Sequence, residues 1–433
     1  MHVFGDILNW LPAGVKEQLL DLQGRFLMLW QQTKLEQPSG NLQKADLIQW
    51  QEDLSEEYIT ELYKTFDVLE FEATAFCHTH GKLCKLSPFA DPALKAMLWI
   101  DGAGSTCCPW ASPSHCQNKW LDEATLVMFT WAYHRRFIQP DLLLHECTEK
   151  FPIDTLLGIF NRHAGRQPKC LHSREIQPVM QPALADILSE EEHDMHAARG
   201  KETGEAQHWR LESVVFSPTD LGIPSRRRRR YSCIRFNDTA PNFADSLDFA
   251  ETFARERQLT AQIYLDIMQT SAPADDLFDA QIARLDGHFL NAHRRGLCSD
   301  TFSSWTVPFA LVDVTQSEQW DGKASYDTFP TVLRKSRLVN LVNGKCVPPP
   351  VYWAAQGFQH PVCASCADTE HGLPFDASLL HGGLSAAEQR SLLGNSMHRQ
   401  QMGSWFLHCF ACIDVQWSNL CVPSTASASG HES

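Results

Sequence analysis

Two short apolar runs flank one amphipathic stretch between residues 96 and 146. The runs AMLWID (96–101) and PDLLLHE (140–146) have the length and composition of buried strands. Between them, LDEATLVMFTWAYHRRF (121–137) repeats its apolar residues every three or four positions, which predicts a helix. Strand–helix–strand crossovers are almost always right-handed with parallel strands, so both strand ends should reach the same edge of the sheet.

The rest of the chain divides into helical and strand-like stretches, which together predict a mixed α/β protein. Leu8 to Glu72 reads as helical and acidic, and residues 249–295 read as two amphipathic helices. LESVVFS (211–217) predicts another strand, and short β-like pieces follow at 303–361, namely WTVPFALVDV, RLVNLV and PPPVYWAA. The final STASASGHES is low in complexity, which predicts disorder.

The composition narrows the class of protein. With 433 residues, 43% of them hydrophobic and 21% charged, the chain has the make-up of a globular protein large enough for more than one lobe. No apolar stretch is long enough to span a membrane, and the first residues do not resemble a signal peptide. The formal net charge of −15 argues against a surface coated for nucleic acid, so phosphate contacts would need a local basic patch.

A thiol and a carboxyl follow the two strands of the predicted crossover. Cys107 comes just after the first strand and a glycine-rich turn, and Glu146 ends the second. Open α/β sheets bind ligands at this edge, so the pattern predicts that both groups share a crevice. A buried, inert Cys107 and a solvated Glu146 are the alternatives, and Cys108 is the second candidate for a reactive thiol.

Five consecutive arginines at 226–230 form the sharpest charge feature of the sequence. A solvated run or a nuclear import signal would each explain them. If the run is extended, Arg227 and Arg229 share one face and the other three arginines share the opposite face. One face would then serve a pocket while the other contacts phosphates.

The 15 cysteines are odd in number, which favours free thiols, a catalytic thiol or metal ligands over a disulfide framework. Two clusters have residue types that bind metals. The first is a compact group whose spacing matches no standard zinc finger, Cys77, His78, His80 and Cys84. The second is half of a possible zinc site, Cys363 and Cys366 with His360 and His371 nearby. We assign no metal ligand from the sequence, and zinc binding stays open at both clusters.

The order of these motifs resembles that of the cytosine-C5 DNA methyltransferases, and the chain looks like a divergent eukaryotic member. Gly104-Ser-Thr-Cys107-Cys108-Pro-Trp110 is similar to the nucleophile motif, and Glu146-Cys147-Thr148 to the Glu-Asn-Val motif. The remaining matches to the family's motifs are Gly222-Ile-Pro-Ser225-Arg-Arg227-Arg-Arg229, Gly394-Asn395-Ser396 and Asp6-Ile7.

The resemblance implies a truncated doubly wound, Rossmann-like methyltransferase domain with a smaller, mixed target-recognition lobe. The implied divisions are a catalytic domain at 1–236 with insertions at about 8–76 and 165–210, a recognition lobe at 237–385, a returning segment at 386–415 and a disordered tail at 416–433. The family's Phe-x-Gly-x-Gly loop and its ribose-binding acid would precede Asp6, and this chain lacks both. We therefore expect a truncated chain or one without its methyl-donor site.

The resemblance also implies an activity, the transfer of a methyl group from S-adenosylmethionine to C5 of a flipped cytosine in DNA. Cys107 would be the nucleophile and Glu146 the acid, while the pair Arg227 and Arg229 would orient the base. The donor pocket would be lined by Asp6, Asn395 and Ser396. The implied protein is a nuclear monomer without a membrane partner. Two alternatives stay open: the same chemistry on a tRNA cytosine, and a catalytically impaired remnant that binds nucleic acid or protein.

Overall fold

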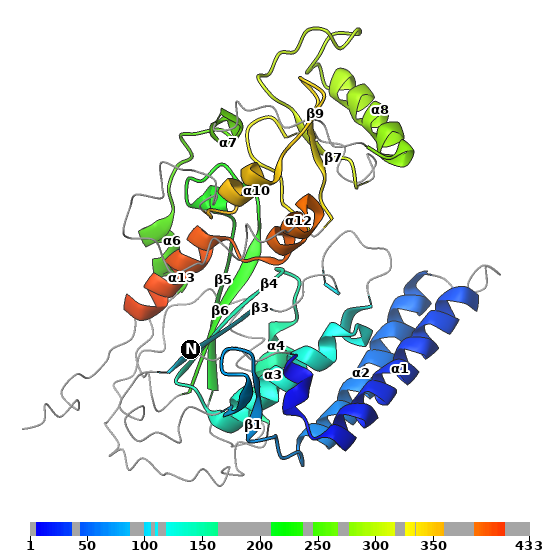
Figure 1. The fold of residues 1–433 in the computed structure, drawn as a ribbon, viewed down its shortest axis with the longest axis vertical. Coiled ribbons are helices and arrows are strands. Elements are labelled where there is room, and N and C mark those ends of the chain that lie inside the picture. The colour runs from blue at the N-terminus through cyan, green and yellow to red at the C-terminus, as the bar shows by residue number, and fades with distance from the viewer. Residues whose placement is uncertain are drawn as a thin grey trace, which may run out of the picture.

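The computed structural model describes residues 6–36, 44–86, 99–104, 109–110, 118–162, 209–236, 246–266, 277–316, 325–333, 335–358 and 385–411. Cys107, Cys108, Cys363 and Cys366 lie outside the described residues, as do the predicted tail and nearly all of the predicted insertion at 165–210. Figure 1 shows a central sheet with a pair of long helices at one end and a smaller lobe at the other.

The central sheet has four strands in the order β3 (Ile100–Gly104), β4 (Leu142–Cys147), β6 (Arg229–Phe236) and β5 (Trp209–Phe216). β3 and β4 are parallel and joined through α3 (Ala124–Ile138), which confirms the predicted crossover. β6 runs antiparallel to both β4 and β5. The predicted glycine-rich turn is wrong, because Gly102 and Gly104 belong to β3 and pair with β4.

Helices cover both faces of this sheet, so the predicted α/β class is confirmed. α3 and α4 (Ile153–Asn161) pack on one face, against Leu143 and Cys147 of β4. α6 (Ser246–Phe253) and α13 (Arg399–Ala411) pack on the other, against Leu142 and Leu144. A strand buried on both faces reads as a continuous apolar run, which is why LLL marks β4 in the sequence.

The helical prediction for the N-terminal region is confirmed by two long antiparallel helices, α1 (Ala13–Glu36) and α2 (Lys44–Phe66). Phe26 of α1 packs against Tyr58 of α2, and Phe66 of α2 stacks on Tyr133 of α3. A short 3-10 helix, η1 (Ile7–Trp10), precedes them. A hairpin of β1 (Thr74–Cys77) and β2 (Lys82–Lys85) follows α2.

The smaller lobe is built around a three-stranded antiparallel sheet of β7 (Leu311–Asp313), β8 (Leu338–Asn340) and β9 (Lys345–Cys346). The predicted second amphipathic helix is α8 (Asp279–Arg294). The strand expected at PPPVYWAA is wrong: these residues form α10 (Pro349–Ala355), because prolines suit the first turn of a helix and Val351 and Ala355 are buried one turn apart.

The first amphipathic helix of this region is broken, unlike the prediction. α6 ends at Phe253. The next described helix is α7 (Gln262–Asp266), which has five residues. Between them, the Arg255 amide donates to the Asp220 carbonyl, which draws the backbone out of helical geometry. α6 packs on the central sheet, whereas α12 (Ala386–Asn395) packs with α10 in the smaller lobe.

Among the described residues, no helix combines the length and apolarity needed to cross a membrane.

Candidate active site

Glu146 lies at the carboxyl end of β4, on the face covered by α13, and is only 3% exposed. Its Oε1 is 3.2 Å from Nε of Arg229, held by charge rather than by an aligned hydrogen bond. Gly104 ends β3 directly opposite. A Cβ on Gly104 would lie 3.4 Å from Glu146 Oε2 and 2.8 Å from Cε of Met397, so the glycine leaves room for both side chains.

The arginine run alternates in burial as its predicted extended form requires. Arg227 and Arg229 are buried, whereas Arg226 and Arg228 are exposed. β6 begins at Arg229, so the alternation starts in the extended backbone just before the strand. Two of the five arginines are therefore buried, so the run as a whole is not solvated.

The outward arginines hold the loop that follows β4. Arg228 Nε donates to Glu149 Oε2 at 2.6 Å, and Arg230 donates to the Glu149 carbonyl at 3.2 Å. Arg230 also reaches the Ser213 hydroxyl on β5. Because Glu149 follows Glu146 by three residues, these contacts fix the end of β4 and with it the catalytic candidate. Glu149 is 79 residues from Arg228 in the sequence, so no local pattern connects the two, and the sequence analysis did not identify this contact.

Arg227 binds backbone carbonyls that belong to other parts of the chain. Its guanidinium donates to the carbonyls of Val332 at 3.2 Å and of Gly394 and Ser396, and it is only 1% exposed. The Gln401 amide on α13 donates to the Arg227 carbonyl in return. Arg227 thus joins the sheet, the smaller lobe and the link between α12 and α13, while Arg229 meets Glu146.

The three residues expected at the donor pocket belong to different elements of the structure and have different contacts. Ser396 lies beside Arg227, and its hydroxyl donates to the Leu393 carbonyl. Asn395 ends α12, and its side chain lies outside the described residues. Asp6 caps η1 by accepting from the Leu8 amide and lies 3.8 Å from Nζ of Lys16.

η1 itself packs near the starts of the strands rather than near their ends. Trp10, its last residue, packs against His134 near the end of α3, with the two rings tilted by 49°. The neighbouring Arg135 pairs with Asp101 at the start of β3. The contacts of η1 therefore direct Asp6 to a region different from the one that holds Glu146.

Two buried histidines beside the site are neutral at physiological pH. Burial lowers the pKa of His145 to about 3, and its ring packs between Trp131 and Phe151 on the α3 face. Burial, with a smaller effect from Arg227, lowers the pKa of His398 to about 3 as well. Glu146 is therefore the acid that the arrangement offers for chemistry at this edge.

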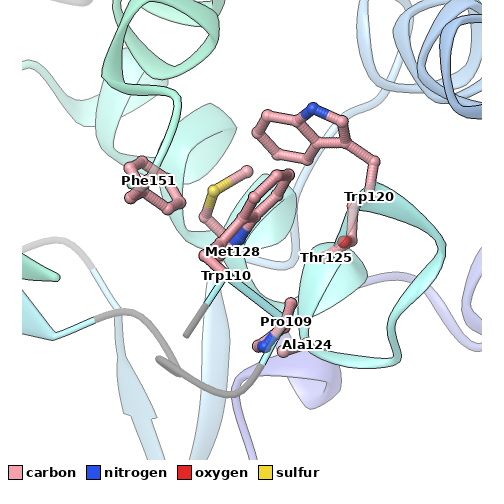
Figure 2. Close-up of a pocket in the computed structure, with 7 residues that line it drawn as sticks. All are labelled: Pro109, Trp110, Trp120, Ala124, Thr125, Met128 and Phe151. Atoms are coloured by element: carbon pink, nitrogen blue, oxygen red, sulfur yellow. The ribbon is translucent and has the colours of Figure 1, made fainter. Parts of the chain in front are cut away.

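An aromatic contact holds the chain at Trp110, three residues after the candidate thiol of Cys107. Trp110 packs edge-on against Trp120 at 4.7 Å between ring centroids and against Phe151 at 6.0 Å. Figure 2 shows Trp110 beside Met128, between these two rings. The remaining cavity is about 10 Å³, the size of one water molecule at most, so this is a packing contact and not a ligand pocket.

No protein-family model matches the chain, and no curated protein matches it. Among the solved structures that are similar to it are three methyltransferases. The methyltransferase EhMeth of Entamoeba histolytica has 11% identity over 77% of this chain and 84% of that chain, with a TM-score of 0.32. The S. pombe Dnmt2 methyltransferase has 11% identity over 71% and 77%, with a TM-score of 0.33. A putative DNA modification methyltransferase encoded within a prophage of E. coli has 12% identity over 76% and 83%, with a TM-score of 0.40. Because every TM-score is below 0.5, this likeness supports no assignment of activity.

Proposed function

We propose that the chain is a cytosine-C5 methyltransferase-like protein that acts on DNA and captures a flipped cytosine through Cys107. The observation that carries this proposal is the buried Glu146–Arg229 pair at the carboxyl edge of the sheet. It faces Gly104, and Cys107 follows Gly104 by three residues. Three residues of chain span at most about 11 Å, so the Cα atom of Cys107 can be no farther than that from the Cα atom of Gly104.

The chemistry uses a thiol, an acid and a cation in distinct roles. Cytosine C5 becomes nucleophilic only when a thiolate has added to C6, which splits one difficult step into two easier ones. Glu146 donates a proton or hydrogen bond to ring N3 as negative charge develops there. Arg229 fixes the orientation of that carboxyl. The base must leave the stack for this attack, at a cost of a few kcal/mol.

S-adenosylmethionine is the methyl donor that belongs to this reaction, and the described residues fit it only in part. Ser396 lies beside the site, but its hydroxyl and carbonyl already bond Leu393 and Arg227. The Asp6 carboxylate is engaged by the Leu8 amide and lies near Lys16. The donor set is thus incomplete, and we derive only the covalent capture of the base from this chain's own residues.

A catalytically impaired binding protein is the second candidate. Two observations favour it: Arg227 bonds backbone carbonyls, and Asp6 acts as a helix cap. Such a protein would use the outward Arg226 and Arg228, whose side chains are more than half exposed, for phosphates. With either function we propose a monomer, and for the DNA-acting protein we propose a nuclear location.

Covalent trapping on modified DNA tests the proposal. DNA that carries 2-pyrimidinone in place of cytosine should form a stable adduct through C6 without any donor. We expect the adduct in the wild type and in Cys108→Ala, but not in Cys107→Ala. An adduct that survives Cys107→Ala would overturn the assignment of the nucleophile.

Three further measurements separate the candidates. Calorimetry with S-adenosylmethionine and trapping on 5-fluorocytosine DNA, which requires methyl transfer, distinguish an enzyme from a binding remnant. A folded chain that binds DNA but gives neither donor binding nor any adduct would favour the remnant. RNA oligonucleotides in the same trapping assay test the tRNA alternative.

A further inference from the structure

The β1–β2 hairpin brings together three side chains of the kind that bind zinc. We propose that Cys77, His80 and Cys84 bind one Zn²⁺ through two thiolates and one imidazole nitrogen, with solvent in the fourth position. Their ligand atoms all lie within 4.8 Å of one another. This cluster is separate from the Glu146–Arg229 site and does not depend on the proposed function.

The distances in the cluster are those of a tetrahedral zinc site. Nδ1 of His80 is 3.4 Å from Sγ of Cys77 and 3.5 Å from Sγ of Cys84. With Zn–S bonds of about 2.3 Å and a Zn–N bond of about 2.0 Å, tetrahedral angles place sulfur and nitrogen about 3.5 Å apart. The three ligands therefore lie where a single ion would hold them.

The backbone explains why these residues converge. Cys77 ends β1 and pairs with Lys82, and Cys84 pairs with Ala75, so both cysteines are on the buried face of the hairpin. His80 lies in the connecting turn, which Gly81 closes with a φ of +61°. Only a residue that tolerates this left-handed conformation returns the chain in register.

His78, in the same turn, is a natural comparison for His80. Its ring packs edge-on against Phe76, which is half-exposed on the opposite face of the hairpin. The turn thus directs His80 to the two sulfur atoms and His78 to Phe76. Two thiolates and an imidazole favour zinc over the hard cations Mg²⁺ and Ca²⁺, which prefer oxygen ligands.

A bound ion would account for the stability of this hairpin. Each strand has only four residues, and an isolated two-stranded hairpin is at best marginally stable in water. Its buried apolar contacts are few: Ala75 and Leu86 pack with Trp10 of η1. The ion would join both strands and the turn, and would thereby stabilise the hairpin surface against which Trp10 of η1 packs.

Metal analysis of the full-length chain tests the proposal. Protein purified under reducing conditions should contain zinc, and Cys77→Ser, His80→Ala and Cys84→Ser should each lose one equivalent per chain. His78→Ala and Cys346→Ser are matched controls that should keep the wild-type content. Co²⁺ in the wild-type chain should show the absorption of a tetrahedral site with two thiolates, which does not depend on the folding of any variant.

Three results would overturn the proposal. The first is a wild-type chain that neither carries zinc nor gives the Co²⁺ spectrum. The second is zinc content that is the same in Cys84→Ser and His78→Ala as in the wild type. The third is a Cys77–Cys84 disulfide that persists under reducing conditions, because bonded sulfurs cannot act as two thiolate ligands.

Discussion

Two carboxylate–guanidinium pairs lie at opposite ends of the central sheet, and they differ in what surrounds them. Asp101 pairs with Arg135 at the start of β3, where Arg135 also lies over the ring of Trp10. That pair joins η1, α3 and the sheet, and both of its side chains are partly buried. Glu146 pairs with Arg229 at the opposite end, facing a glycine and the link between α12 and α13. An ion pair within the sheet is therefore not a site by itself; the second pair is the candidate because it is buried at the ligand-binding edge of the sheet.

The largest difference between the two pairs should appear in covalent trapping. Glu146→Gln removes the acid but keeps the shape, so we expect the rate of adduct formation on 2-pyrimidinone DNA to fall about 100-fold or more. Asp101→Asn should lose stability and keep the rate per folded molecule. Equal rates in wild type and Glu146→Gln would remove Glu146 from the chemistry.

Arg227 and Arg229 belong to the same run but differ in their partners: Arg227 contacts backbone carbonyls, and Arg229 contacts Glu146. Arg227→Ala leaves the carbonyls of Val332 and Ser396 without their buried cation, so we expect a loss of about 3 kcal/mol in the free energy of unfolding. Arg229→Lys should retain most of the stability and slow adduct formation. Denaturant unfolding measures the first effect, and a loss below about 1 kcal/mol for Arg227→Ala would contradict its joining role.

The pH dependence of stability tests the buried histidines. His145 has its pKa lowered from 6.5 to about 3, so the unfolded chain binds this proton first as the pH falls. Its contribution is complete above pH 6.5 and is lost toward pH 3, at about 1.4 kcal/mol per pH unit. His145→Phe removes one proton taken up on unfolding, so the free energy of unfolding should fall less steeply between pH 6.5 and pH 3. An unchanged slope would show that His145 is not held neutral in the folded protein.

The exposed arginines should give the smallest effect. The side chains of Arg228 and Glu149 are 61% and 44% exposed, so Arg228→Ala should change the free energy of unfolding by less than about 1 kcal/mol. If the outward face contacts phosphates, the same substitution should weaken DNA binding and lower the salt slope by about one. Glu149→Gln, which releases Arg228, is the matched variant and should strengthen binding. Unchanged DNA binding in both variants would show that Arg228 only holds the loop after β4 and does not contact phosphates.

Local patterns predicted the parts of the fold that local geometry decides. The apolar period of α3 and the alternation in burial of Arg227 and Arg229 follow from helix and strand geometry, so the sequence was enough. The glycines of β3 look like a turn, and only pairing with β4 makes them a strand. The contact of Arg227 with Gly394 spans 167 residues, and no feature near either residue indicates it.

The candidate site was predictable to a similar extent. Topology alone predicts a thiol and a carboxyl at one edge of the sheet. The structure has Glu146 at that edge, whereas Cys107 lies outside the described residues and its place stays a prediction. Met397 lies next to Gly104, and the Gln401 amide donates to the Arg227 carbonyl. Both contacts depend on how α13 packs against the sheet. Those contacts arise from packing between distant segments, which composition and spacing do not encode.

The most direct test of the central claim, that Cys107 shares a pocket with Glu146 and Arg229, is the pH dependence of Cys107 alkylation, followed by peptide mass spectrometry. Removing the nearby negative charge in Glu146→Gln should lower the pKa of the Cys107 thiol, and removing the positive charge in Arg229→Gln should raise it. Asp101→Asn, at the other pair, should leave it unchanged. Identical alkylation profiles in Glu146→Gln, Arg229→Gln and the wild type would contradict the shared pocket.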